Sequence, residues 1–245
     1  MSSAELTAEL ALQEASWQRN KVLRSLYQSW FAQIAQSRAS VPGPTVELGS
    51  GIGALREALP DVTLTDVEPT RWSEQVVDAE ELPFQDSSVA NLVLVDVLHH
   101  IPRPQRFLDE ATRCLLPGGR VILLEPYCST ISYPVYRRWH HETTDLRVDP
   151  FSEDPRSTAS PLDSNQALPT LLFFRHAQRF EERWPELRIV SRQRLALLAY
   201  PLSGGWRRRP LLPYRLLGTT LAIEQLLTPL APVLAFRCLV VLERA

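Results

Sequence analysis

Three of the nine glycines, Gly49, Gly51 and Gly53, lie at or just after the end of an apolar run at 45–49 and before a helical stretch predicted at 54–58. Glycines at such a turn let backbone N–H groups approach a ligand without a Cβ in the way, and the following helix N-terminus contributes positive potential. A glycine-rich turn can also be a tight connection that only packs. The residues around the turn therefore decide whether it binds a ligand.

Acidic residues accompany the first three predicted strands. Glu47 lies two residues before the first glycine, Asp66 ends the predicted strand 62–66, and Asp78 ends a short strand at 76–79. The carboxyl ends of parallel strands meet at one edge of a sheet, where open α/β folds bind ligands. Asp66 can accept both hydroxyls of a ribose diol, and Asp78 can accept an adenine amino hydrogen. Three carboxylates would repel a pyrophosphate but suit a cation, so we expect a cationic nucleoside.

Four of the five histidines follow two other predicted strands. His99 and His100 come after the strand at 89–97, and His140 and His141, followed by Glu142, come after the strand at 120–126. A neutral imidazole accepts a proton at pH 7, so His99 and His100 are candidate catalytic bases. Alternatively, one histidine of each pair caps or packs and the other is solvated. No metal site is predicted, since adjacent residues project in different directions and no His-x-x-x-His spacing occurs.

Composition excludes several classes of protein. The net charge of −2 and pI near 6.2 do not favour nucleic-acid partners. Without a charge-free apolar run of roughly 20 residues or a signal-peptide pattern, we expect a cytoplasmic protein with no stable membrane insertion. Cys114, Cys128 and Cys238 are scattered, as free thiols in a reducing compartment are. Lys21 is the only lysine, which argues against a P-loop, a Tyr/Lys dehydrogenase or a Schiff-base enzyme.

The elements that position these residues alternate strands with helices, which is typical of a mostly parallel sheet covered on both faces. We predict amphipathic helices within 4–37, a helix at 104–116 that ends before Pro117 and Gly118, and a polar segment without periodicity at 143–168. The further predicted elements are helix 169–183, strand 187–197, helix 211–227 and strand 234–244. We expect one domain over 1–245, with a helical extension at 1–40, a ligand-binding core at 41–127 and an acceptor-side region at 128–245.

Successive motifs in this order resemble those of class I S-adenosylmethionine-dependent methyltransferases over about residues 40–127. The motifs are VELGSGIG, TD at 65–66, VDAEELPF, VLVDVLHHI and CLLPGGRVILLEP. The resemblance implies a Rossmann-like, doubly wound α/β sheet of seven strands, with three αβα layers and the last strand antiparallel. It also implies S-adenosyl-L-methionine as the cofactor.

The resemblance assigns cofactor contacts as well. Glu47, Gly49 and Gly51, with Ser50 and Gly53 in the same turn, would face the methionine end, Asp66 the ribose, Asp78 and Ala79 the adenine, and Asp96 the sulfonium. Only 11 residues separate Asp66 from Asp78, so the helix that usually joins these strands must be short or lost. Trp72 is then either a stacking face for the adenine or surface packing.

The sequence therefore predicts methyl transfer to a small or lipid-like acceptor. Leucine-rich residues 211–242 could line an apolar acceptor pocket or simply belong to the core, and Arg207 to Arg209 could hold an anionic acceptor or be solvated. One alternative is an NAD(P)-dependent oxidoreductase, because Gly49, Gly51 and Ala54 fit G-x-G-x-x-A. Another is a non-catalytic binding module with the same fold.

Overall fold

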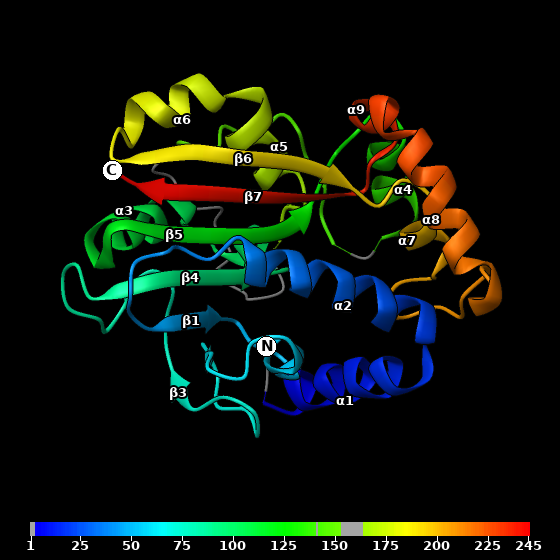
Figure 1. Ribbon diagram of the computed structural model, residues 1–245, viewed down its shortest axis with the longest axis horizontal. Helices are drawn as coiled ribbons and strands as arrows, with labels where there is room; N and C mark the ends of the chain where they lie inside the picture. Colours follow the sequence, from blue (N-terminus) through cyan, green and yellow to red (C-terminus); the bar gives the residue numbers. More distant parts are fainter. Residues whose placement is uncertain (1–2, 141, 153–163) are drawn as a thin grey trace.

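The computed structural model describes residues 3–140, 142–152 and 164–245, and it contains a seven-stranded sheet in the order β3-β2-β1-β4-β5-β7-β6 (Figure 1). Strands β1 to β5 pair in parallel, whereas β7 runs antiparallel to both β5 and β6. The predicted sheet with an antiparallel last strand is confirmed. The strands are β1 Thr45–Leu48, β2 Thr63–Asp66, β3 Gln75–Val76, β4 Val89–Val95, β5 Leu115–Pro126, β6 Leu187–Leu195 and β7 Arg237–Arg244.

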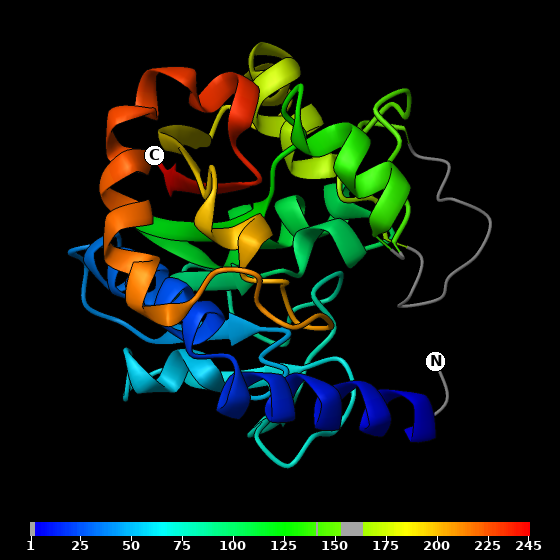
Figure 2. The ribbon, with the colours of Figure 1, turned by 90° about the vertical axis from the view of Figure 1, so that its right-hand side faces the viewer.

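Helices cover both faces of this sheet and also gather where the parallel strands end, as two views at right angles show (Figures 1 and 2). The α-helices are α1 Ser3–Arg19, α2 Lys21–Gln36, α3 Pro104–Cys114, α4 Ser132–Trp139, α5 Leu168–Thr170, α6 Ala177–Arg183, α7 Ala199–Leu202, α8 Leu217–Leu226 and α9 Ala231–Leu234. Short 3₁₀ turns are η1 Ala54–Glu57, η2 Leu98–His100, η4 Tyr214–Leu216 and η5 Thr228–Leu230, and a π-helical turn, η3, spans Leu171–Arg175.

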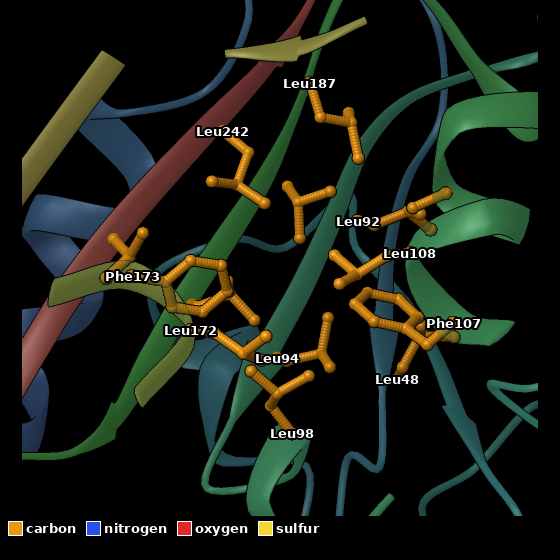
Figure 3. Close-up of a cluster of buried hydrophobic side chains, with 14 of the residues drawn as sticks. Leu48, Leu92, Leu94, Leu98, Phe107, Leu108, Leu172, Phe173, Leu187 and Leu242 are labelled. Atoms are coloured by element: carbon orange, nitrogen blue, oxygen red, sulfur yellow. The ribbon is translucent and has the colours of Figure 1, made fainter. Parts of the chain in front are cut away.

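Alternate side chains of the central strands build two cores. On β4, Leu92 and Leu94 join a cluster with α3, η3 and α6, whereas Val93 joins a second cluster that includes α2 and η1. Successive side chains of a strand point to opposite faces, so a strand buried on both sides contributes to both layers. Figure 3 shows the first cluster, in which side chains of β4 and α3 meet those of η3.

The connection from β2 to β3 departs from the usual pattern of strand, helix, strand. Residues 67–74 contain no helix, which confirms that the expected connecting helix is lost. The third strand is shorter than predicted and ends at Val76, because the chain turns at Asp78, which forms an isolated bridge with Glu81. Asp78 therefore lies two residues beyond its strand.

Other boundaries differ by a few residues. Helix α3 ends at Cys114 because Leu115 already pairs with Val89, and the register then shifts across Pro117 and Gly118. The predicted helices within 4–37 are confirmed as α1 and α2, separated at Asn20. Part of the predicted polar segment, 153–163, and His141 lie outside the described residues.

The leucine-rich region around α8 is largely exposed, with Leu211 at 78% and Leu226 at 81% relative exposure. Among the described residues, none of the helices is long and apolar enough alone to cross a membrane. The helical segments Tyr214–Leu226 and Thr228–Leu234 reach that length and apolar character only when they are taken together, and the chain bends by 68° between them.

Candidate functional site

A cavity of about 280 Å³ opens where β1, β2 and β4 end. Gly49, Ser50 and Gly51 line it from the turn after β1, and Asp66 and Asp96 line it from the ends of β2 and β4. Gly49 has φ +68°, and a Cβ at this position would lie 2.5 Å from Val97 Cγ2. Glycine is therefore required here by both backbone conformation and space. Of the three carboxylates expected to meet at this sheet edge, Glu47 and Asp66 line the cavity and Asp78 does not.

Glu47 contributes a buried carboxyl group to the cavity. Burial raises its pKa well above the ordinary range, the charge of Asp66 raises it further, and Arg56 lowers it. Among the described residues, Glu47 Oε2 and the neighbouring Ser50 Oγ are buried without a hydrogen-bond partner. Buried polar atoms are normally paired, so these two atoms fit a ligand that brings donors, such as the ammonium of an amino acid.

Asp66 lies at the rim of the same cavity. Its Oδ2 accepts the N–H of Gly51 at 3.0 Å, so the glycine turn and the end of β2 are held together. Burial raises the pKa of Asp66, and backbone hydrogen bonds from Gly51, Glu68 and Val67 oppose that shift. A carboxylate in this position can accept hydrogen bonds from a ribose diol.

Asp96 is balanced by a cation that the sequence analysis did not identify. The Asp96 Oδ1 atom lies 2.5 Å from Arg237 of β7, and Tyr27 of α2 donates to Oδ2 at 2.6 Å. Burial acts to raise the pKa of Asp96, but Arg237 holds it below the ordinary value. Asp96 itself has φ +60°. The expected carboxylate thus borders the cavity as the partly exposed half of an ion pair with the buried Arg237.

The N-terminal helices and a distant loop close the cavity with aromatic and apolar groups. Leu10 of α1, Phe31 of α2 and Trp206 line it, and Trp206 donates from Nε1 to Tyr27 Oη at 3.1 Å. The sequence predicted amphipathic helices within 4–37 and assigned no role to Trp206. An amphipathic pattern indicates that a helix has a buried face but not what that face covers.

A second cavity, of about 360 Å³, adjoins the first and shares Glu9, Gln13, Asp96, His100 and Trp206 with it. Its other walls include Tyr136, Trp139, Tyr200, Arg207, Arg208 and Phe236. Arg207 is paired with Glu9 at 2.6 Å. In the apolar region 211–242, Phe236 and Arg237 border this cavity, while α8 and α9 do not.

His99 lies in the second cavity between two carboxylates. Its Nδ1 is 2.6 Å from Glu125 Oε2, and its Nε2 is 3.3 Å from Glu142 Oε2. Burial alone would lower the pKa of His99, but Glu125 and Glu142 raise it to about 10. An imidazolium cannot accept a proton, so this environment does not suit His99 as a base at neutral pH. His100 is more exposed and borders both cavities.

Three side chains from two segments, His99 and His100 of η2 and Glu142 after α4, meet in the second cavity. Each offers one ligand atom, and these atoms all lie within 4.8 Å of one another. No metal site was predicted, because adjacent histidines were expected to project in different directions. The structure differs, because η2 brings the two adjacent imidazole rings to 4.3 Å and Glu142 approaches them after α4.

The remaining predicted site residues lie outside the first cavity. Gly53, with φ +66°, begins η1, and Asp78 and Ala79 follow β3 without lining the cavity. Ile52 and Val67 line the wall on this side instead. Trp72 packs on the second core cluster with Arg71 over its ring at 4.2 Å, which corresponds to surface packing.

Comparison with known proteins identifies the domain. Residues 46–123 match the family model described as a methyltransferase domain. An uncharacterized 37.1 kDa protein in transposon TN4556 of Streptomyces fradiae is 33% identical over 114 residues, covering 43% of this chain and 33% of that protein. A demethylmenaquinone methyltransferase of Clavibacter sepedonicus is 39% identical over 61 residues, covering 25% of this chain and 24% of that protein. The chain thus spans a third or less of the length of these curated relatives.

Solved structures share the fold at low sequence identity. A Haloferax volcanii protein in complex with the Trm112 methyltransferase activator is 17% identical with a TM-score of 0.53, covering 100% of this chain and 97% of that chain. Geranyl diphosphate C-methyltransferase from Streptomyces coelicolor, in complex with Mg²⁺, geranyl diphosphate and S-adenosyl-L-homocysteine, is 14% identical with a TM-score of 0.51. The coverage is 92% of this chain and 82% of that chain.

The strand order, the antiparallel β7 and the cavity at the glycine turn define a Rossmann-like methyltransferase fold. Together with the family match, they confirm the class that the motifs predicted. The chain carries a class I S-adenosylmethionine-dependent methyltransferase domain.

Proposed function

We propose that this chain transfers the methyl group of S-adenosylmethionine to a small or lipid-like acceptor and releases S-adenosylhomocysteine. The observation that carries the proposal is the buried Glu47 carboxyl group, which has an unpartnered oxygen beside the glycine turn and Asp66. A cavity with two carboxyl groups suits a ligand that carries an ammonium, a sulfonium and a neutral ribose.

In this proposal each end of the cofactor has its own residues. Glu47 accepts hydrogen bonds from the amino group, the turn at Gly49 and Gly51 lies against the amino-acid end, and Asp66 accepts the ribose hydroxyls. The adenine contacts Ile52 and Val67, because these residues line the cavity where Asp78 and Ala79 do not. The short connection between β2 and β3 supports this shifted adenine wall.

The second cavity is the proposed acceptor site. S-adenosylmethionine supplies an electrophilic methyl carbon, and much of the rate enhancement can come from holding an acceptor lone pair about 3 Å from it. Asp96 and His100 border both cavities and therefore mark the place where donor and acceptor meet. Pairing with Arg237 leaves Asp96 ionised but locally balanced, which suits a position beside a sulfonium.

The walls of the second cavity indicate the kind of acceptor. Tyr136, Trp139, Tyr200 and Phe236 provide aromatic surface, which fits a flat or apolar molecule. One curated relative is named for demethylmenaquinone, and one solved structure with the same fold is named for geranyl diphosphate. His100 remains the predicted base for a hydroxyl or carbon acceptor. His99, held between Glu125 and Glu142, fixes the position of the turn η2 that carries His100.

The alternative of an NAD(P)-dependent oxidoreductase is disfavoured by the same carboxyl groups. A dinucleotide places its pyrophosphate against the glycine turn, where an ionised Asp66 would repel it and where Glu47 would add to the repulsion whenever it is ionised. A non-catalytic binding module would bind the cofactor without turnover. Incubation with methyl-labelled S-adenosylmethionine and fractionated small-molecule extract distinguishes that alternative, because we expect label in an organic-soluble product.

Asp66→Ala tests the cofactor assignment. Loss of a charge-assisted contact to the ribose diol should weaken binding of S-adenosylmethionine by about 1.5 to 3 kcal/mol, roughly 10- to 150-fold. The variant also loses the bond from the Gly51 N–H, so we expect a lower melting temperature without ligand as well. Isothermal titration calorimetry measures the affinity.

Asp61→Ala is the matched control, because Asp61 is an exposed aspartate that pairs with Arg38 outside the cavity. We expect this variant to bind the cofactor as the parent chain does. Unchanged affinity in Asp66→Ala, or tighter binding of NADH than of S-adenosylmethionine by the parent chain, would contradict the proposed function.

A further inference from the structure

We propose that His99, His100 and Glu142 bind a divalent first-row transition-metal ion at the acceptor side of the cofactor cavity. The inference rests on the proposed function only in the role it gives the ion, since the ligand set stands on its own geometry. Two imidazoles and a carboxylate that leave positions open form a recurrent site for Zn²⁺, Fe²⁺ and related ions.

The separations between the ligand atoms fit one ion. Glu142 Oε2 is 3.3 Å from His99 Nε2, and Glu142 Oε1 is 3.7 Å from His100 Nε2. Ligand atoms bound about 2.0 to 2.2 Å from a common tetrahedral or octahedral ion lie roughly 3 to 3.6 Å apart. The two nitrogen–oxygen separations are thus close to those around one ion, and the ligand atoms of the three residues all lie within 4.8 Å of one another.

Glu125 orients the first imidazole. Its Oε2 atom is 2.6 Å from His99 Nδ1, and its Oε1 atom accepts the backbone N–H groups of Val97 and Leu98 at 2.9 and 2.7 Å. A carboxylate that holds one ring nitrogen as N–H turns the other nitrogen towards a metal, the usual arrangement around metal-bound histidines. Glu125 is fully buried on β5, so its position is set by the sheet.

The opposite side of the cluster is also held in place. Gln166, itself 2% exposed, donates from Nε2 to Glu142 Oε2 at 2.7 Å, and the backbone N–H of Asn165 donates to the His99 carbonyl at 2.8 Å. The three ligands thus come from two segments that are fixed by buried partners. Two imidazoles favour a borderline metal over Mg²⁺ or Ca²⁺, which prefer oxygen ligands.

The location gives the ion a function. His100 borders both cavities, so an ion there faces the place where acceptor and methyl group meet. It would bind an acceptor that offers one or two oxygens, such as an enol or a phenol with a neighbouring carbonyl. The coordinated hydroxyl gives its proton to solvent, its oxygen bonds to the methyl carbon, and the C–S electron pair stays on sulfur. In this role His100 is a ligand instead of the base.

Metal binding to tag-free, chelator-stripped protein tests the site. Calorimetry with ZnCl₂ should show saturable binding of one ion per chain. CoCl₂ should produce visible absorption bands of a nitrogen- and oxygen-ligated ion. We expect His100→Gln and Glu142→Gln each to weaken Zn²⁺ binding at least about tenfold, and Glu125→Gln to weaken it about 10- to 100-fold.

His176→Ala is the matched control, because His176 begins α6 and contacts Phe151 outside the cluster. We expect it to bind Zn²⁺ as the parent chain does. Zn²⁺ binding that survives both His100→Gln and Glu142→Gln would overturn the proposal, as would no saturable binding to folded parent protein. Affinity for S-adenosylmethionine, measured separately in the same samples, distinguishes failure of this site from failure of the proposed function.

Discussion

Glu47 illustrates how a single buried side chain can control ligand binding. It sits at 3% exposure beside Asp66 of β2, with Arg56 of η1 as the charged group that opposes the effect of burial. Because its pKa is raised, the ligand-free chain holds this carboxyl group protonated at pH values where an ordinary glutamate is ionised. The carboxylate is the form that binds an ammonium, so cofactor binding must remove the proton.

Cofactor affinity should therefore rise with pH through the raised pKa of Glu47 and then level off. The stability of the ligand-free fold has the opposite pH dependence. The contribution of Glu47 to the free energy of unfolding is fully present below the ordinary glutamate pKa and is lost as the pH rises through the raised pKa of the folded state. Titration calorimetry between about pH 5 and 7, below the ordinary amino pKa of about 7.7 to 8.0, measures the binding slope.

Glu47→Gln should remove this slope and lower affinity at neutral pH by roughly tenfold or more. Glu57→Gln is the control, because Glu57 lies outside the cavity and hydrogen-bonds Trp17 and Gln28. A slope that persists in Glu47→Gln would show that another group takes up the proton.

At the scale of single residues, sequence reasoning succeeded where a residue's role follows from its neighbours in the chain. Gly49 and Asp66 each end or follow a recognisable strand, and both line the cavity. It missed Arg237, which lies 141 positions after Asp96 and reaches it only because β7 pairs with β5. It also missed the approach of Glu142 to His99, since neither apolar periodicity nor spacing encodes contacts between distant segments.

At the scale of elements, the residue before α2, Asn20, makes two separate hydrogen-bond contributions. Asn20 caps the helix by accepting the N–H of Leu23 at 3.1 Å, and its amide donates to the carbonyl of Ser203 at 2.9 Å. The second bond fixes the loop that carries Trp206 into the cavity. The side chain is 2% exposed, so water cannot replace either bond.

Asn20→Ala should lower the free energy of unfolding by about 1 to 3 kcal/mol, because it removes a helix cap and leaves a buried carbonyl unpaired. Asn20→Asp keeps the cap acceptor but loses the amide donor, so we expect it to retain the cap while remaining less stable than the parent chain. Urea denaturation measures both. Equal stability of the alanine variant and the parent would refute the dual role.

Elements were predicted well where they are long and apolar, and poorly where pairing decides the boundary. The nearly continuous apolar runs of β4 and of the second half of β5 are recognisable because both faces of these strands are buried there. In contrast, β3 is two residues long, and its end depends on the bridge between Asp78 and Glu81. The predicted adenine contact at Asp78 relied on that boundary.

For the molecule as a whole, ligand binding should be visible as stabilisation. At a concentration 100 times its Kd, S-adenosylmethionine should add about 2.7 kcal/mol to the unfolding free energy. For a chain of this size that is a rise in melting temperature of roughly 5 to 11 °C. Differential scanning fluorimetry measures the shift, with NADH as the matched control. A larger shift with NADH would oppose the proposed cofactor.

The position of β7 has a consequence for how the molecule is made. β6 lies at the edge of the sheet and, among the described strands, pairs with β7 alone. Residues 187–195 therefore have no strand partner until residues 237–244 have been synthesised. At ribosomal speeds that interval lasts roughly 2 to 10 s. Until it ends, β5 presents an unpaired edge and Asp96 lacks Arg237. A nascent chain therefore passes through a state that is prone to aggregate and whose cavity is still incomplete.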